Sequence, residues 1–177
     1  MVSAAQNSPQ ILSELSSKLG EKCLLTAKAE EQQAIAALNT LTALANEAMI
    51  IAQPHLCAQL PNTLMAAGSK SAGIRSAAEA AVTTLISKMS QLAVPEVLQH
   101  LFKATEVEKP WQTRALALRC IASLGDIAPE QLGRALPDVV PQVTNSMSDT
   151  KKDVSEAAKA AMTSVYDTFS VELLHTL

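Results

Sequence analysis

The feature that most constrains this chain is an internal repeat with a spacing of eighty residues. Residues 61–85 read PNTLMAAGSKSAGIRSAAEAAVTTL, and residues 141–165 read PQVTNSMSDTKKDVSEAAKAAMTSV. The two segments align without a gap, and their matched apolar pairs are Ile74 with Val154, Ala78 with Ala158, Ala81 with Ala161, and Leu85 with Val165. A third copy fits midway between them. The underlying period of about forty residues is typical of two helices joined by a turn.

The composition favours helices over strands. Of the 177 residues, 48% are hydrophobic but only 2% are aromatic, so the core must consist mainly of Ala, Leu, Ile, Val and Met. Small aliphatic side chains let helices pack closely, whereas strands favour aromatic and β-branched residues. We therefore predict an all-α fold, a HEAT-like α-solenoid of antiparallel helix pairs with about four repeats.

Prolines and apolar stripes place these repeats along the chain. We predict a disordered N-terminus over residues 1–8 and a single HEAT-repeat domain over residues 9–177, with repeats at about 9–52, 53–91, 94–127 and 129–170. Ser8 and Pro9 predict the first helix start, and Pro54 the end of the second helix, predicted from about residue 28 to 52. Pro61 predicts a kink or division, and Pro141 is expected to occupy the same place in the last repeat.

The predicted helices should bury one apolar stripe each. In the first helix this stripe comprises Ile11, Leu12, Leu15 and Leu19. Trp111, the only tryptophan, is expected to fill a gap between repeats rather than to serve as a stacking platform. The tail at residues 171–177 has no polar cap. It could begin a further repeat, so we expect a truncated chain or a partner at that end.

Catalytic, cofactor-binding and metal-binding motifs are not found in the sequence. It contains neither a phosphate-binding loop nor a dinucleotide, serine-hydrolase or zinc-protease signature. His55, His100 and His175 are far apart, and we expect them on helix surfaces. We predict no enzyme activity, no cofactor and no small-molecule substrate.

The remaining sequence features bear on location. No apolar run is long enough to span a membrane, and the N-terminus lacks the pattern of a signal peptide. The three cysteines, Cys23, Cys57 and Cys120, are widely spaced beside aliphatic residues, as expected of free thiols that act as small apolar groups. We predict a cytoplasmic protein.

Six basic residues flank the predicted turns within the last three repeats. They are Lys70, Arg75, Lys109, Arg114, Lys151 and Lys152. Stacked repeats place equivalent turns in a row, so these cations could form a ridge that contacts phosphate groups or an acidic protein. Lysines at turns can also have no role other than solubility. The positive potential is further reduced by nearby carboxylates, those of Glu106, Glu108, Asp149 and Asp153.

Residues 109–165 resemble the N-terminal HEAT region of fungal-type translation elongation factor 3. The segments that carry the resemblance are KPWQ at 109–112, LPDVVP at 136–141 and DTKKDV at 149–154, while SAAEAA at 76–81 fits the preceding repeat more loosely. A related HEAT stretch occurs in the ribosome-binding activator of the amino-acid-starvation kinase. The resemblance implies docking on the small ribosomal subunit, through its proteins and ribosomal RNA. It also implies that ATP hydrolysis belongs to cassettes that this sequence does not contain.

The sequence departs from the regular HEAT pattern at the turns. HEAT repeats often pair an Asp in one turn with an Arg of the neighbouring repeat. Here Ser69 replaces the Asp that would accompany Arg75, and Ser155 replaces the Arg that would accompany Asp149. We therefore expect no regular ladder of such pairs.

Two function hypotheses remain open at this stage. The first is a ribosome-docking module that binds rRNA and ribosomal proteins. The second is a generic protein–protein adaptor that uses the polar face of the second helices, formed by Ser76, Glu79, Thr83, Glu156, Lys159 and Thr163.

Overall fold

A computed structural model describes the backbone of residues 2–25 and 29–175 and the side chains of residues 9–25 and 29–167. The described residues form α-helices and one short 3-10 helix, without a strand. The chain divides into two compact units, Met1–Met89 and Ser90–Leu177, each with two of the predicted helix pairs. That residues 9–177 form a single domain stays a prediction.

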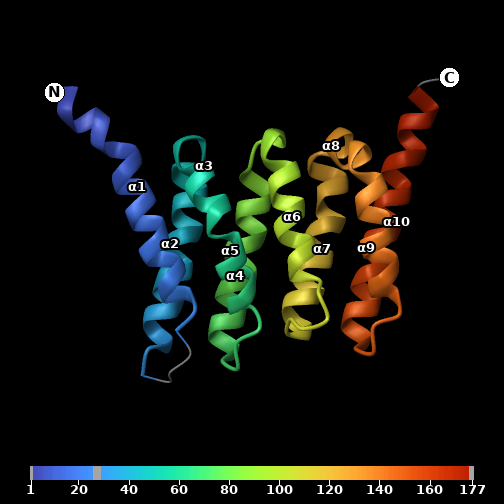
Figure 1. Cartoon of the computed structure of the whole chain (residues 1–177), viewed down its shortest axis with the longest axis horizontal. Coiled ribbons are helices and arrows are strands. Elements are labelled where there is room, and N and C mark those ends of the chain that lie inside the picture. Colours follow the sequence, from blue (N-terminus) through green and yellow to red (C-terminus); the bar gives the residue numbers. More distant parts are fainter. Residues whose placement is uncertain (1, 26–28, 176–177) are drawn as a thin grey trace. The chain divides into compact units, whose positions relative to one another are not determined.

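The first unit contains five helices (Figure 1). They are α1 (Val2–Cys23), α2 (Glu31–Glu47), α3 (Met49–Ala58), α4 (Leu60–Ala66) and α5 (Ala72–Lys88). Helices α1 and α2 form the first antiparallel pair. Helices α3 and α4 together form the first arm of the second pair, and α5 forms its second arm.

The second unit repeats this plan. Its elements are η1 (Gln91–Ala93), α6 (Val94–Ala104), α7 (Trp111–Ile127), α8 (Pro129–Arg134), α9 (Leu136–Met147) and α10 (Lys152–His175). Helix α6 pairs with α7, and α8 and α9 together pair with α10.

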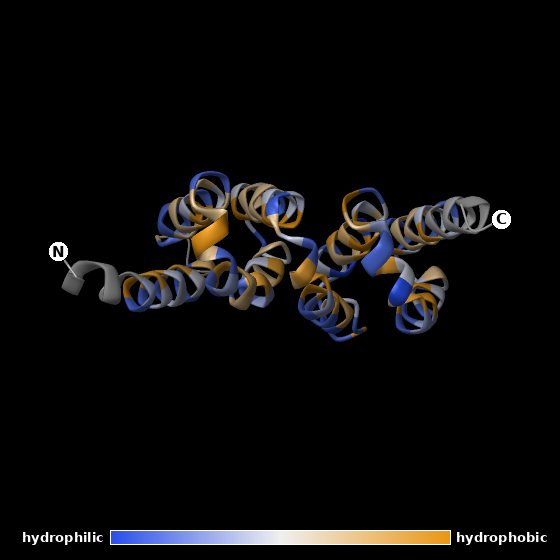
Figure 2. Ribbon diagram, turned by 90° about the horizontal axis from the view of Figure 1, so that it is seen from above, coloured by the Kyte–Doolittle hydropathy of each residue, from blue (hydrophilic) through white to orange (hydrophobic). Residues whose placement is uncertain are grey.

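Within each unit the helices lie in two rows, one of first arms and one of second arms (Figure 2). The second arms pack extensively against each other, α2 against α5 in the first unit and α7 against α10 in the second. This arrangement leaves the turn within each pair at one edge of its unit. Within a unit, the turns of its two pairs therefore lie at the same edge (Figure 1).

The apolar positions matched across eighty residues are buried in both copies. Ile74 and Val154 are at most 2% exposed. The other matched pairs, Ala78 with Ala158, Ala81 with Ala161, and Leu85 with Val165, are likewise buried. Equivalent positions of α5 and α10 thus have the same environment, as expected of structural repeats.

The first arms of the second and fourth pairs are divided close to a proline, as predicted for Pro61. The predicted equivalence of Pro61 and Pro141 is wrong. The break lies at Gln59, two residues before Pro61, and at Ala135, two residues before Pro137. Proline suits the first turn of a helix because its missing N–H has no intrahelical acceptor there. Since Pro137 already sets the start of α9, Pro141 lies inside that helix and has a different role from Pro61.

Helix α1 buries only part of the predicted stripe, because Leu12 and Leu19 are half-buried while the other two residues are exposed. Ile11 is 61% exposed and Leu15 is also exposed, whereas Ser16, Gly20 and Cys23 are buried. A Cβ atom on Gly20 would overlap the side-chain amide of Gln59 at the α3–α4 break and lie 3.0 Å from Nδ2 of Asn62. Small residues thus let α1 approach the second pair closely, which hydrophobic periodicity alone does not reveal.

Three predicted helix limits also differ. The predicted helix over residues 28–52 ends at Glu47, and α3 continues through Pro54. Helix α1 begins at Val2, within the segment predicted to be disordered; Met1 and residues 176–177 lie outside the described residues. The tail continues α10 to His175, because neither Gly nor Pro interrupts residues 166–175.

Candidate functional site

The six predicted cations differ in how much of each side chain reaches solvent. Lys70, Lys151 and Lys152 are exposed, Arg75 and Lys109 are half-buried, and Arg114 is buried. Lys70 and Arg75 belong to the first unit, and the other four to the second. The three exposed lysines are therefore the most accessible of the six to a partner.

Arg75 supports the turn that precedes its own helix. Its Nη1 donates hydrogen bonds to the carbonyl oxygens of Ser69, at 3.0 Å, and Lys70, at 2.8 Å. These carbonyls lie between α4 and α5, outside the helical hydrogen-bond pattern, so the guanidinium satisfies acceptors that would otherwise need water.

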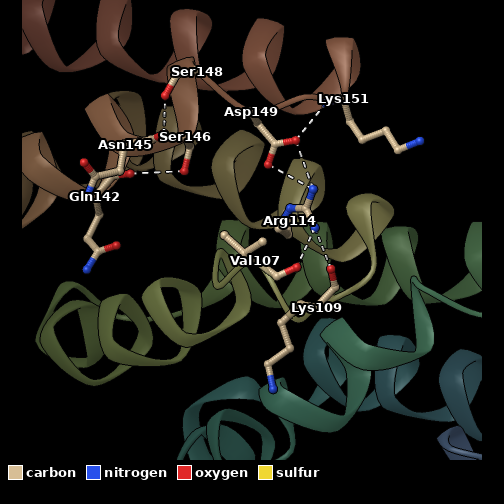
Figure 3. A network of polar contacts seen from close by, with 9 residues as sticks. All are labelled: Val107, Lys109, Arg114, Gln142, Asn145, Ser146, Ser148, Asp149 and Lys151. Carbon is tan, nitrogen blue, oxygen red and sulfur yellow. Dashed lines mark hydrogen bonds and ion pairs between the residues drawn. The ribbon is translucent and has the colours of Figure 1, made fainter.

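Arg114 has the same function in the second unit. Its Nη1 donates to the carbonyl oxygens of Val107, at 3.0 Å, and Lys109, at 2.7 Å (Figure 3). An arginine in the first turn of the second arm thus holds the preceding turn in both units. The sequence pairs these arginines with turns but does not show that they point inward.

Arg114 also connects its turn to the next one. Its Nη2 lies 3.0 Å from Oδ1 and 2.9 Å from Oδ2 of Asp149, and the two side chains are 9% and 11% exposed. Oδ1 of Asp149 also accepts a hydrogen bond from the backbone N–H of Lys151 at 2.8 Å. The backbones of Lys109 and Lys151 are therefore linked through one buried ion pair, while both lysine side chains extend away from it (Figure 3).

The first unit links its two turns differently. The hydroxyl of Ser71 donates to Oε1 of Glu31, which begins α2, and Oγ of Ser71 accepts from the N–H of Ile74 at 3.3 Å as the N-cap of α5. Oγ of Ser69 accepts from the N–H of Ser71, as Asp149 does from Lys151. In each unit a polar contact thus connects the turns of its two repeats, with different chemistry, in agreement with the expectation of no regular Asp–Arg ladder.

Lys152 and Trp111 complete the surface of these turns in the second unit. Nζ of Lys152 lies 3.4 Å from Oε1 of Glu156, an exposed pair with little effect on stability. Trp111 is 37% exposed, so part of its ring reaches solvent, and the prediction that it fills a gap between repeats stays a prediction. It is the first residue of α7, directly after Pro110.

The described residues contain no catalytic or metal-binding constellation. No three His, Cys, Asp or Glu side chains are grouped to hold a metal ion in the described part of the chain. His100 lies 4.0 Å from Glu96 on the surface of α6, His55 is half-buried in α3, and the side chain of His175 lies outside the described residues. None of the described helices is long and apolar enough to cross a membrane.

The cysteines lie in the core, as predicted. Cys23, Cys57 and Cys120 are buried free thiols. Burial raises the pKa of Cys23 to about 11, against the opposing effect of a backbone hydrogen bond. A thiol that stays protonated at neutral pH is a poor nucleophile, so Cys23 has a packing role.

Comparison with known proteins identifies the repeats. The family model described as the EF3 N-terminal HEAT repeat matches residues 2–162. The chain belongs to the elongation factor 3 N-terminal HEAT repeat family. This confirms the resemblance in the sequence and the predicted all-α, HEAT-like solenoid class.

Individual relatives agree with this family. The chain is 43% identical to elongation factor 3 of Phytophthora infestans over 98 residues, which are 55% of this chain and 9% of that protein. It is 32% identical to elongation factor 3B of Saccharomyces cerevisiae over 140 residues, 78% of this chain and 13% of that protein. It is 30% identical to elongation factor 3 of Eremothecium gossypii over 149 residues, 83% of this chain and 14% of that protein.

The matched region includes every turn described above. All six cations lie between residues 2 and 162, within the EF3 N-terminal HEAT repeat. The chain is thus similar to a translation-factor region that makes up a small part of each relative's length. Its turns are features of that region rather than of a separate domain.

Proposed function

We propose that this chain is a ribosome-docking module that acts in translation elongation in the cytoplasm without chemistry of its own. The observation that carries the proposal is the family match over residues 2–162, with relatives named elongation factor 3. The turns described above support it, because side-chain hydrogen bonds from Arg75 and Arg114 hold them in place for binding.

The proposed mechanism is recognition by preformed turns. Lys70, Lys151 and Lys152 are exposed at the turn edges of their units, where each ammonium group can contact an rRNA phosphate. Arg75 and Arg114 act as positioning residues, each within its own unit, because their guanidinium groups already bind turn carbonyls. Lys109 is half-buried and follows the exposed Glu106 and Glu108 in the same turn, and these carboxylates weaken its attraction for phosphate.

Charge reversal of Lys151 and Lys152 tests the phosphate contacts. We expect Lys151→Glu with Lys152→Glu to weaken co-sedimentation with purified ribosomes roughly tenfold at moderate salt. The slope of log affinity against log salt should become shallower by about 0.7–0.9 for each phosphate group that the variant no longer neutralises.

A matched control variant changes the net charge by the same amount but at positions outside the turns. Lys18→Glu with Lys88→Glu reverses two exposed lysines that lie outside the turns, and we expect it to keep the wild-type salt slope. Equal binding of the Lys151/Lys152 variant and wild type at every salt concentration would remove the phosphate claim. A wild-type chain that stays in the supernatant at low salt would remove the docking function itself.

The alternative function is a protein–protein adaptor that binds along the second arms. The six polar residues predicted for that face lie on α5 and α10, and they are Ser76, Glu79, Thr83, Glu156, Lys159 and Thr163. They carry both signs of charge, which suits a protein partner better than a phosphate backbone. A pull-down that survives RNase treatment and contains no ribosomal protein would favour the adaptor.

A further inference from the structure

The segment over residues 105–111, here called the Trp111 turn, exposes two large apolar side chains. Val107 is 80% exposed and Trp111 is 37% exposed. A tryptophan at the surface buries a large area when a partner covers it, and tryptophan is enriched among residues that dominate binding energy.

The backbone of the Trp111 turn is held in place before any partner arrives. Arg114 binds the carbonyl oxygens of Val107 and Lys109, and the N–H of Lys109 donates to the carbonyl of Glu106 at 3.0 Å. At the start of the turn, the Thr105 hydroxyl donates to the Phe102 carbonyl at 2.7 Å. A turn fixed in this way loses little conformational entropy on binding, which favours affinity.

The charge of the Trp111 turn selects the kind of partner. Glu106 and Glu108 are exposed, whereas Lys109 is half-buried, so two carboxylates face solvent with one ammonium group. Arg114 adds no free positive charge, because Asp149 neutralises it at 2.9 Å. The turn is therefore net negative around its apolar side chains, which opposes a phosphate backbone and suits a basic surface.

We propose that the Trp111 turn docks a protein partner with an apolar hollow bordered by basic residues. Trp111 and Val107 fill the hollow, while Glu106 and Glu108 pair with the basic border. This inference rests on the proposed ribosome docking and deepens it, since it assigns the Trp111 turn to a basic ribosomal protein. Contact with rRNA is left to Lys70, Lys151 and Lys152.

Charge reversal in the Trp111 turn distinguishes the two classes of partner. Glu106→Lys with Glu108→Lys changes exposed side chains and should leave the fold intact. If the turn binds a basic protein, the variant should bind ribosomes about tenfold or more weakly than wild type. If the turn instead binds rRNA, the same two changes should raise the affinity for ribosomes and make that affinity depend more steeply on salt. Raised or unchanged affinity would overturn the proposal.

Truncation of the aromatic side chain tests the apolar part. We expect Trp111→Ala to weaken ribosome co-sedimentation about tenfold or more, as at other interface tryptophans. Leu92→Ala is the matched control, because Leu92 is 90% exposed in η1 of the same unit and should bind as wild type. Equal weakening in both variants, or wild-type binding by Trp111→Ala, would contradict the proposal.

A cross-linking measurement remains decisive if Trp111→Ala fails to fold. A photoreactive amino acid at position 107 replaces a side chain that is 80% exposed. After irradiation with ribosomes, we expect an RNase-resistant adduct that contains a ribosomal protein; an adduct only to rRNA would overturn the proposal. If the wild-type chain does not bind ribosomes, the proposed function fails first and this inference falls with it. If wild type binds and these variants match it, only the inference fails.

Discussion

At the scale of single residues, Arg114 shows how the structure changes the meaning of a sequence pattern. A cation at a turn suggests a phosphate ligand, yet Arg114 is buried and bound to two carbonyl oxygens and one carboxylate. Its Nε has no hydrogen-bond partner among the described residues. A charge removed from water in this way must be paired, so Arg114 serves the fold of the turns rather than direct binding.

Removal of the Arg114 guanidinium should strongly destabilise the second unit. Arg114→Met leaves Asp149 as an unpaired carboxylate at 11% exposure, and breaking a buried ion pair typically costs about 3–5 kcal/mol. We expect urea unfolding to report a destabilisation of this order. Arg75→Met should cost less, about 1 kcal/mol, because Arg75 is half-buried and its two contacts are hydrogen bonds to carbonyls.

The double variant Arg114→Met with Asp149→Leu separates pairing from packing. Since it removes both charges, it should recover part of the stability that Arg114→Met removes; the carbonyls of Val107 and Lys109 and the N–H of Lys151 still lose their partners. A double variant that is no more stable than Arg114→Met would show that the ion pair is not the source of the destabilisation.

At the scale of helices, α1 illustrates packing through small residues. Ser16, Gly20 and Cys23 form the buried face, and Gly20 lies against Gln59, whose Oε1 accepts a hydrogen bond from Asn62 at 3.1 Å. The larger apolar residues Ile11 and Leu15 are left exposed.

A bulky residue at position 20 should separate α1 from its neighbours. We expect Gly20→Leu to destabilise the first unit by about 1–3 kcal/mol, the usual cost of overpacking. Gly20→Ala should cost less, because Gln59 is a flexible side chain that can move and Ala is the better helix former by about 1 kcal/mol. Thermal unfolding followed by circular dichroism measures both; equal melting temperatures for wild type and Gly20→Leu would contradict this packing.

Much of the helix pattern follows from the sequence, and its exceptions have physical causes. Repeated apolar positions such as Ile74 and Val154 predict buried faces because repetition reports a shared environment. The boundary at Ala48 has neither Gly nor Pro beside it, so no local signal marks it. The inward direction of Arg114 depends on carbonyls that only the folded turn brings together, so the sequence alone does not reveal it.

At the scale of the whole molecule, two units with the same plan offer several preformed turns. The first unit presents Lys70 on a turn held by Arg75, and the second presents Lys151, Lys152 and the Trp111 turn around Arg114. Within each unit, turns held in this way can bind a partner through several modest contacts. We therefore assign docking to the turns and leave the exposed faces of α5 and α10 free for other partners.

Hydrogen exchange with and without ribosomes tests this central claim most directly. We expect binding to increase protection of backbone amides in residues 67–71, 105–111 and 148–152. The amides on the exposed faces of α5 and α10 should exchange at the same rates with and without ribosomes. Protection confined to those faces, with the turns unchanged, would contradict the account.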